Sequence, residues 1–137
     1  MENSIYSDKA PTPVGAYPHA KKVGNLLFLS GVGPRKKNSK EIPGVKLSSS
    51  GAIESYDISV QCVSVFENIK LILEDAGSNW DNIVDVTVFL TNMENDFSIY
   101  NKLYKDYFAV PFPTRTTIEI KSLPTPIAIE LKVVATI

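Results

Sequence analysis

The stretch DISVQCVSVFENIKLILEDAG, residues 57–77, carries the clearest helical pattern in the chain. Its apolar residues recur at three- and four-residue steps and so share one helix face: Ile58, Cys62, Val65, Phe66, Ile69, Ile72, Leu73 and Ala76. Asp57 can cap the first turn, and Gly77 can end the last one. Soon afterwards residues 83–90, IVDVTVFL, alternate and are rich in β-branched side chains, which predicts a strand. The chain therefore combines helices with strands.

Four more elements are expected on either side of this stretch. Residues 23–32, VGNLLFLSGV, form a short apolar run bounded by glycine, which predicts a buried strand. After a turn and cap in residues 92–96, a second helix is expected over residues 96–108, with one stripe formed by Phe97, Tyr100, Leu103, Tyr104 and Phe108. Residues 114–120 and 127–137 alternate, which predicts two final strands.

The order strand, helix, strand, helix, strand, strand predicts one α+β domain over residues 1–137, with two helices on one face of a mixed sheet. A polar loop is expected over residues 35–50. Because side chains alternate with period two, Arg115 and Glu130 are expected on the face turned away from the helices. That face also carries Val134 and neighbouring threonines, and so we expect it to pack against another subunit.

The composition excludes several kinds of site. With one Cys and one His, the chain cannot form an intrachain disulfide or a zinc site of the usual Cys and His type. Lys and Arg number 14 against 15 Asp and Glu, and this net charge of −1 argues against a basic surface that binds nucleic acid. Residues 1–13 are polar and lack the apolar core of a signal peptide, and no apolar run is long enough to span a membrane. We expect a cytoplasmic protein without membrane contact.

Arg115 and Glu130 are the charged residues that stand out in the two final strands. A guanidinium in mid-strand can grip a carboxylate through two parallel hydrogen bonds. A lone acid between Ile129 and Leu131 can hold or activate a water, particularly where burial raises its pKa. The structural alternatives are an ion pair between subunits or a solvated edge position for Arg115, and an ion pair with Lys132 or Arg115 for Glu130. The residues alone leave both interpretations open.

Other polar residues have simpler interpretations. Tyr17 lies in a stiff, proline-rich loop and can offer its hydroxyl to a ligand, although such a tyrosine more often only packs. Residues 30–35, SGVGPR, can present backbone N–H groups to an anion, but they lack the GK[ST] ending of a P-loop. Cys62 is expected to be a small buried apolar residue, and His19 an ordinary surface residue.

Motifs spread over nearly the whole chain resemble the RidA/YjgF family, also called the endoribonuclease L-PSP or translation-inhibitor family. The matching pieces are FLSG at 28–31, ENI at 67–69, VTVFLT at 86–91, DF at 96–97, YN at 100–101, PTRTT at 113–117, LP at 123–124 and IEL at 129–131. The most specific element is the spacing of Arg115 and Glu130, each in its own motif. The runs PVGAYPH, SGVGPR and PTRTTI, and the insertion after SGVGPR, look closest to the 2-aminomuconate deaminase branch.

The resemblance implies a chorismate-mutase-like α+β fold, assembled as a homotrimer with sites in the clefts between subunits. It implies hydrolytic deamination of small enamines and imines that carry a carboxylate, of the 2-aminomuconate or 2-aminoacrylate type, with release of ammonia and without a metal or organic cofactor. By position, Arg115 would hold the substrate carboxylate and Glu130 would position or activate the attacking water. The other substrate-binding residues that the resemblance implies are Tyr17, Ser30, Gly31, Asn101 and Thr117.

One departure from the family falls at Thr117, where many members have a cysteine. Thiol-based mechanisms cannot apply at that position, although the backbone there can still contact a ligand. Two other functions stay open. One is a non-catalytic protein that binds small 2-keto acids or other carboxylates. The other is an endoribonuclease or translation inhibitor, which the slightly negative charge and single His make the least expected.

Overall fold

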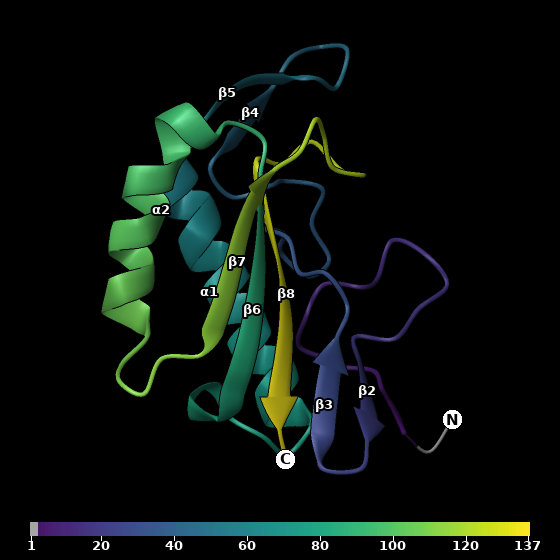
Figure 1. Ribbon diagram of the computed structural model, residues 1–137. Coiled ribbons are helices and arrows are strands. Elements are labelled where there is room, and N and C mark those ends of the chain that lie inside the picture. The colour runs from purple at the N-terminus through teal and green to yellow at the C-terminus, as the bar shows by residue number, and fades with distance from the viewer. Residues whose placement is uncertain (1–2) are drawn as a thin grey trace.

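The computed structural model describes residues 3–137 (Figure 1), so Met1 and Glu2, the start of the polar segment over residues 1–13, lie outside the described residues. In chain order the elements are β1 Ser4–Ile5, β2 Ala20–Val23, β3 Leu26–Leu29, β4 Val45–Leu47, β5 Ile53–Tyr56, α1 Ile58–Asp75, the 3-10 helix η1 Trp80–Asn82, β6 Ile83–Leu90, α2 Met93–Tyr107, β7 Thr114–Glu119 and β8 Ile129–Thr136.

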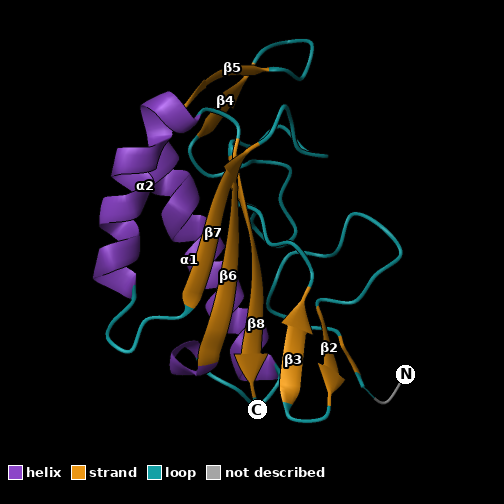
Figure 2. Cartoon of the chain, in the orientation of Figure 1, coloured by secondary structure: helices purple, strands orange, loops and turns teal. Residues whose placement is uncertain are grey.

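The strands form a six-stranded sheet in the order β1-β2-β3-β8-β6-β7, and β4 and β5 form a separate hairpin. Every pair in the large sheet is antiparallel except β6 and β7, which run parallel, so the sheet is mixed. Both helices lie on the same side of this sheet (Figure 2). The predicted α+β architecture, two helices backing a mixed sheet, is confirmed.

The central elements follow the sequence pattern closely. Helix α1 begins after Asp57, whose side chain accepts hydrogen bonds from the backbone N–H groups of Ser59 and Val60, as predicted for a cap. Strand β6 spans the predicted residues. Helix α2 begins three residues earlier than predicted, because the Asn92 side chain accepts a hydrogen bond from the N–H of Asn95 and so caps the helix before Met93.

Two predictions about strands are wrong. Residues 23–32 do not form one strand, because Gly24 adopts a φ of +60° and, with Asn25, makes the two-residue turn of a hairpin that joins β2 to β3. Residues 35–50 are not entirely loop, because Val45–Leu47 pairs with β5. That strand is too short and too exposed to show an alternating apolar pattern.

The core lies between the helices and the middle of the sheet. The residues of β8 that point toward α1 are fully buried: Ile129, Leu131, Val133 and Ala135. Alternate residues on the opposite face are partly or well exposed, including Phe28, Ile118 and Val134. Within residues 3–137 nothing covers this second face, and its packing against another subunit stays a prediction. Neither of the two α-helices in the described part of the chain has the length and apolar character needed to cross a membrane.

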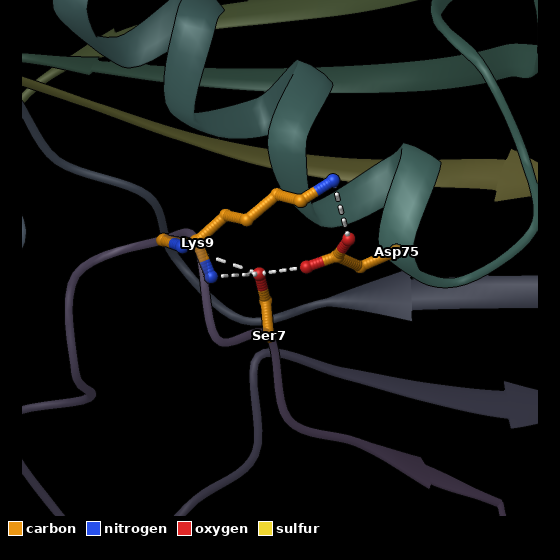
Figure 3. Close-up of polar contacts among 4 residues, drawn as sticks. Ser7, Lys9 and Asp75 are labelled. Carbon is orange, nitrogen blue, oxygen red and sulfur yellow. Dashed lines mark hydrogen bonds and ion pairs between the residues drawn. The ribbon is translucent and has the colours of Figure 1, made fainter.

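Two side-chain contacts hold the N-terminal segment against the end of α1 (Figure 3). The Ser7 hydroxyl donates a hydrogen bond to Asp75 at 2.5 Å, and the Lys9 ammonium forms an ion pair with the same carboxylate at 3.4 Å. The Ser7 hydroxyl also accepts hydrogen bonds from the N–H groups of Lys9 and Ala10. These contacts fix the start of the segment that leads to Tyr17.

His19 completes this anchoring and is not the surface residue that we predicted. Its side chain is buried; Nδ1 accepts a hydrogen bond from the N–H of Ser7 at 2.9 Å, and Nε2 lies 2.7 Å from the carbonyl oxygen of Pro11. The two contacts together require a neutral ring that is protonated on Nε2. A single histidine in a loop gives no sequence pattern from which these partners follow.

Replacing Asp75 by Asn should weaken folding in a pH-dependent way. The Ser7 hydrogen bond holds the pKa of Asp75 below its ordinary value, against an opposing effect of burial and with help from Lys9. A lowered pKa in the folded state contributes stability that is present above the unfolded pKa and is lost as the pH falls. At pH 7, urea unfolding should therefore give Asp75→Asn a lower free energy of unfolding than wild type. This difference should shrink below about pH 4.

The matched control is Asp106→Asn, at an exposed position of α2. A gap between wild type and Asp75→Asn that is equally large at pH 7 and pH 3.5 would contradict the role given to the charged carboxylate.

Candidate functional site

Glu130 lies beside an irregular segment that contains Ser30 and Gly31. Phe28 pairs with Val134, and Val32 pairs with Leu131, so four steps along one strand oppose three along the other. The extra residue makes a β-bulge at residues 29–31. The bulge brings the backbone of Gly31 against the Glu130 side chain, since a Cβ atom added at Gly31 would lie 2.6 Å from Oε2. Any other residue at position 31 would displace the Glu130 carboxylate from its present position.

The Glu130 carboxylate is half-buried and has no hydrogen-bond or ion-pair partner within residues 3–137. Burial raises its pKa above the ordinary value, and the charge of Arg35 opposes that shift. Neither structural partner considered from the sequence pairs with it: Lys132 donates to the carbonyl oxygen of Leu29 at 2.8 Å, and Arg115 lies on the other face of the sheet. An unpaired, partly desolvated carboxylate is suited to binding water or taking up a proton.

A small open cavity lies beside Gly31, and two of the residues that line it, Asn68 and Ile72, belong to α1. Tyr17, Ser30 and Gly31 line it together with Arg35, so the structure brings together three of the predicted substrate-binding residues. Ser30 is fixed in place because its hydroxyl donates a hydrogen bond to the carbonyl oxygen of Pro18 at 2.7 Å. Its enclosed volume of about 30 Å³ is comparable to that of one water molecule, so one chain by itself supplies only a part of a small-molecule site.

Arg115 lies on the helix-covered face of the sheet, which corrects our expectation that it faces away from the helices. It pairs with the buried Val86 across the parallel β6–β7 ladder and shares that residue's face. Its guanidinium carbon lies 4.7 Å from the ring centre of Tyr104, 5.7 Å from that of Tyr100 and 5.9 Å from that of Phe97. These aromatic residues of α2 hold the cation by cation–π contacts.

The prediction for the face of Arg115 is wrong for a physical reason. Thr116 and Ile118 alternate with Arg115 and suggest an apolar core face. Strand β7 is at the edge of the sheet, however, and there the aromatic stripe of α2 packs over Arg115. Glu130 does lie on the face away from the helices, as predicted, since it pairs with Phe89 and its neighbours Ile129 and Leu131 are fully buried.

Two buried hydroxyl groups near Arg115, those of Tyr104 and Thr117, have no hydrogen-bond partner among the described residues, and a third, that of Tyr100, has only the Arg115 guanidinium near it. Burial raises the pKa of both tyrosines, and the charge of Arg115 works in the opposite direction. Asn101 is exposed on α2 and does not line the cavity. Unsatisfied buried hydroxyl groups are uncommon, and here they gather around a cation that can bind an anion.

The predicted site residues therefore fall into two groups in one chain. Tyr17, Ser30 and Gly31 line one cavity, and Gly31 also lies against Glu130, whereas Thr117 and Arg115 lie on the opposite face of the sheet from Glu130. One chain by itself does not bring the arginine and the glutamate together. Residues 3–137 contain no cluster of three His, Cys, Asp or Glu side chains that could hold a metal ion.

Two further residues that shape the cavity were not among the predicted site residues. In the sequence, Arg35 is the end of the SGVGPR run and Asn68 is part of the ENI motif, and both line the cavity. The glycine and proline that precede Arg35 in SGVGPR indicate a turn, and this turn is the only feature of the sequence that could have pointed to Arg35. Cys62, by contrast, is fully buried as predicted, and burial raises the pKa of its thiol to about 12.

The fold and these residues define a small α+β protein with a carboxylate beside a bulged strand. A family model described as Endoribonuclease L-PSP matches residues 7–137. A RutC family protein of Pyrococcus abyssi is 38% identical over 131 residues, 96% of this chain and 94% of its own. The chain therefore belongs to the Endoribonuclease L-PSP family, and the RidA/YjgF resemblance is confirmed.

Solved structures agree with this assignment. RidA from an Antarctic Psychrobacter species is similar to this chain with a TM-score of 0.83 and 31% identity, over 98% of both chains. E. coli TdcF, solved with bound serine, is similar with a TM-score of 0.83 and 30% identity, again over 98% of both chains.

Replacing Gly31 by Ala should displace the Glu130 carboxylate without unfolding the protein. The added methyl group would meet only the end of a flexible side chain, and Gly31 has no positive φ that would strain an alanine. If Glu130 acts in the reaction, kcat/KM should fall about 100-fold, since a displacement of this size can cost that much.

Gly33→Ala is the comparison, because a Cβ atom there would meet Ile127 Cδ1 at 2.9 Å and would not reach Glu130. Equal losses of activity in the two variants would show that crowding at Glu130 is not the cause.

Proposed function

We propose that the protein hydrolyses small enamines and imines that carry a carboxylate, of the 2-aminomuconate or 2-aminoacrylate type, and releases ammonia. The observation that carries the proposal is the Glu130 carboxylate, half-buried and unpaired beside Gly31. Membership of the family supports it, since the chain is similar to a RidA protein over nearly its whole length.

The proposed reaction needs a water and a proton carrier. Glu130 in its ionised form accepts a proton from a water molecule while the water oxygen forms a bond to the imine carbon. Glu130 passes this proton to the nitrogen, which gives a carbinolamine; an enamine substrate first tautomerises to the imine. The hydroxyl proton of the carbinolamine then moves to the nitrogen as the carbon–nitrogen bond breaks, and the products are one keto acid and one ammonia. The raised pKa of Glu130 makes it a stronger base than an exposed glutamate, which favours this role.

The carboxylate of the substrate requires a cation on the other side of the reacting carbon. We assign this role to Arg115 of a neighbouring chain in a homotrimer, because in its own chain Arg115 lies on the opposite face of the sheet from Glu130. In this arrangement one chain supplies Tyr17, Ser30 and Gly31. The neighbour supplies Asn101 and Thr117 with its arginine. The uncovered sheet face with Phe28 and Ile118, each more than a third exposed, supports contact between chains.

The second candidate is a protein that binds small carboxylates without turning them over. The observation in its favour is the similarity to TdcF, which was solved with bound serine, a small molecule with one carboxylate. The same arginine and cavity would serve such a binder, and the two functions differ only in whether Glu130 activates water.

Ammonia release from enzymatically generated 2-aminoacrylate or 2-aminomuconate tests the proposed function. Wild type should accelerate the release, and Arg115→Ala should lower kcat/KM about 100-fold through loss of a paired, charge-assisted contact. Arg115→Lys should fall between them, because lysine keeps the charge but not the two-pronged geometry. Equal rates of ammonia release for wild type and Arg115→Ala would contradict the proposal. Tight binding of 2-ketobutyrate by calorimetry, without turnover of any imine, would favour the binder.

Mixing two inactive variants tests whether a site is shared between chains. In trimers assembled at random from equal amounts of Arg115→Ala and Glu130→Gln chains, about a quarter of the sites combine an intact arginine with an intact glutamate. Activity should therefore return to about a quarter of wild type. Mixing Arg115→Ala with the double variant should restore nothing. Mixed oligomers that form without any recovery of activity would argue against a shared site.

A further inference from the structure

The cavity beside Gly31 contains a positive charge that the proposed hydrolysis does not use. Arg35 lines this cavity with Tyr17, Ser30 and Gly31, and it carries the only formal charge among the described residues that line it. His19 also lines the cavity, but both of its ring nitrogens are occupied by backbone groups, and its ring is neutral. A guanidinium in an otherwise neutral cavity is a site for an anion.

The position of Arg35 is built into the fold. The amide nitrogen of the buried Asn68 on α1 donates hydrogen bonds to the carbonyl oxygens of Gly33 and Arg35, at 3.1 and 2.9 Å. These bonds tie the backbone of residues 33–35 to the helix. At the other end of the side chain, the guanidinium donates to the carbonyl oxygen of Thr12 at 2.8 Å. The arginine is thus held at both ends, and little order has to be imposed when a ligand binds.

The charge of Arg35 is not neutralised within the described residues. It forms no ion pair there, and the single hydrogen bond to Thr12 uses one of its five N–H donors. Glu130 is close enough for the charge of Arg35 to act on its pKa, yet the two side chains do not form an ion pair. The guanidinium therefore keeps donors for a ligand carboxylate, at some distance from the carboxylate that would activate water.

We propose that Arg35 binds a second carboxylate, at the end of the substrate remote from the reacting carbon, and so selects dicarboxylates over monocarboxylates. The proposal rests on the proposed function in one respect: Arg115 holds the carboxylate next to the imine carbon, and Glu130 acts between the two arginines. A substrate with one carboxylate leaves Arg35 without a partner. A substrate with two carboxylates, joined by a short unsaturated chain, reaches both.

Binding of two matched molecules tests this without any turnover. Muconate has six carbons, two double bonds and a carboxylate at each end, and sorbate has the same chain with one carboxylate. Calorimetry on wild type should show muconate binding about 10- to 100-fold more tightly than sorbate, the range expected for hydrogen bonds to a charged group. Arg35→Gln should abolish this preference, and Arg35→Lys should keep part of it.

Lys36→Gln is the control, since it removes the same charge from an exposed neighbouring position. It should leave the preference for muconate unchanged. Equal affinities of wild type for muconate and sorbate would overturn the proposal. So would an Arg35→Gln variant that weakens both molecules to the same extent, because that result assigns Arg35 to anchoring the loop at Thr12.

The kinetic counterpart separates this proposal from the proposed function. Arg35→Gln should raise KM for 2-aminomuconate about 10- to 100-fold and leave KM for 2-aminoacrylate within about threefold of wild type. If the protein releases no ammonia from either compound but prefers muconate through Arg35, the deaminase proposal fails and the second carboxylate site stands. If it deaminates both compounds with no effect of Arg35→Gln, the deaminase stands and the second site fails.

Discussion

The antiparallel pairing of β6 with β8 is the interaction on which the rest of the structure depends. These strands lie side by side inside the sheet, and their core-facing residues are buried. The register sets Phe89 opposite Glu130 and, through the next strand, Val86 opposite Arg115. Because three residues separate Phe89 from Val86, the two charged side chains emerge on opposite faces. The distribution of the site over two faces is a direct result of this register.

The bulge at residues 29–31 and the glycine within it set the local chemistry. A regular pairing of β3 with β8 would put a side chain against Glu130, whereas the bulge puts the backbone of Gly31 there. The carboxylate is therefore shielded from water on one side and left without a donor to neutralise it, which is why its pKa rises. The same bulge redirects the chain toward Gly33 and Arg35, so that one irregularity shapes both the carboxylate and the cavity.

The sequence predicted the parts of this protein that depend on short-range pattern. The face of α1, its cap at Asp57 and the limits of β6 follow from periodicity and capping chemistry. The face on which Arg115 lies could not be predicted in this way. On the edge strand β7, contact with the aromatic stripe of α2 decides which face is covered, and the alternation of Thr116 and Ile118 does not. The partners of His19 and the second charge of the cavity depend on contacts between segments with no shared pattern. Motifs located Glu130 and Gly31, but their mutual packing required the register of β3 with β8.

Strand β8 lies between β3 and β6 in the sheet although it follows every other strand in the sequence. Until it is in place, β3 and β6 each present an unpaired edge with apolar side chains, and the bulge has no partner strand to define it. During synthesis the growing chain therefore passes through a state that is open to edge-to-edge association with other chains. The chain can fold to a state that binds ligand only after β8 has been synthesised. Before that point the chain is most in need of chaperones.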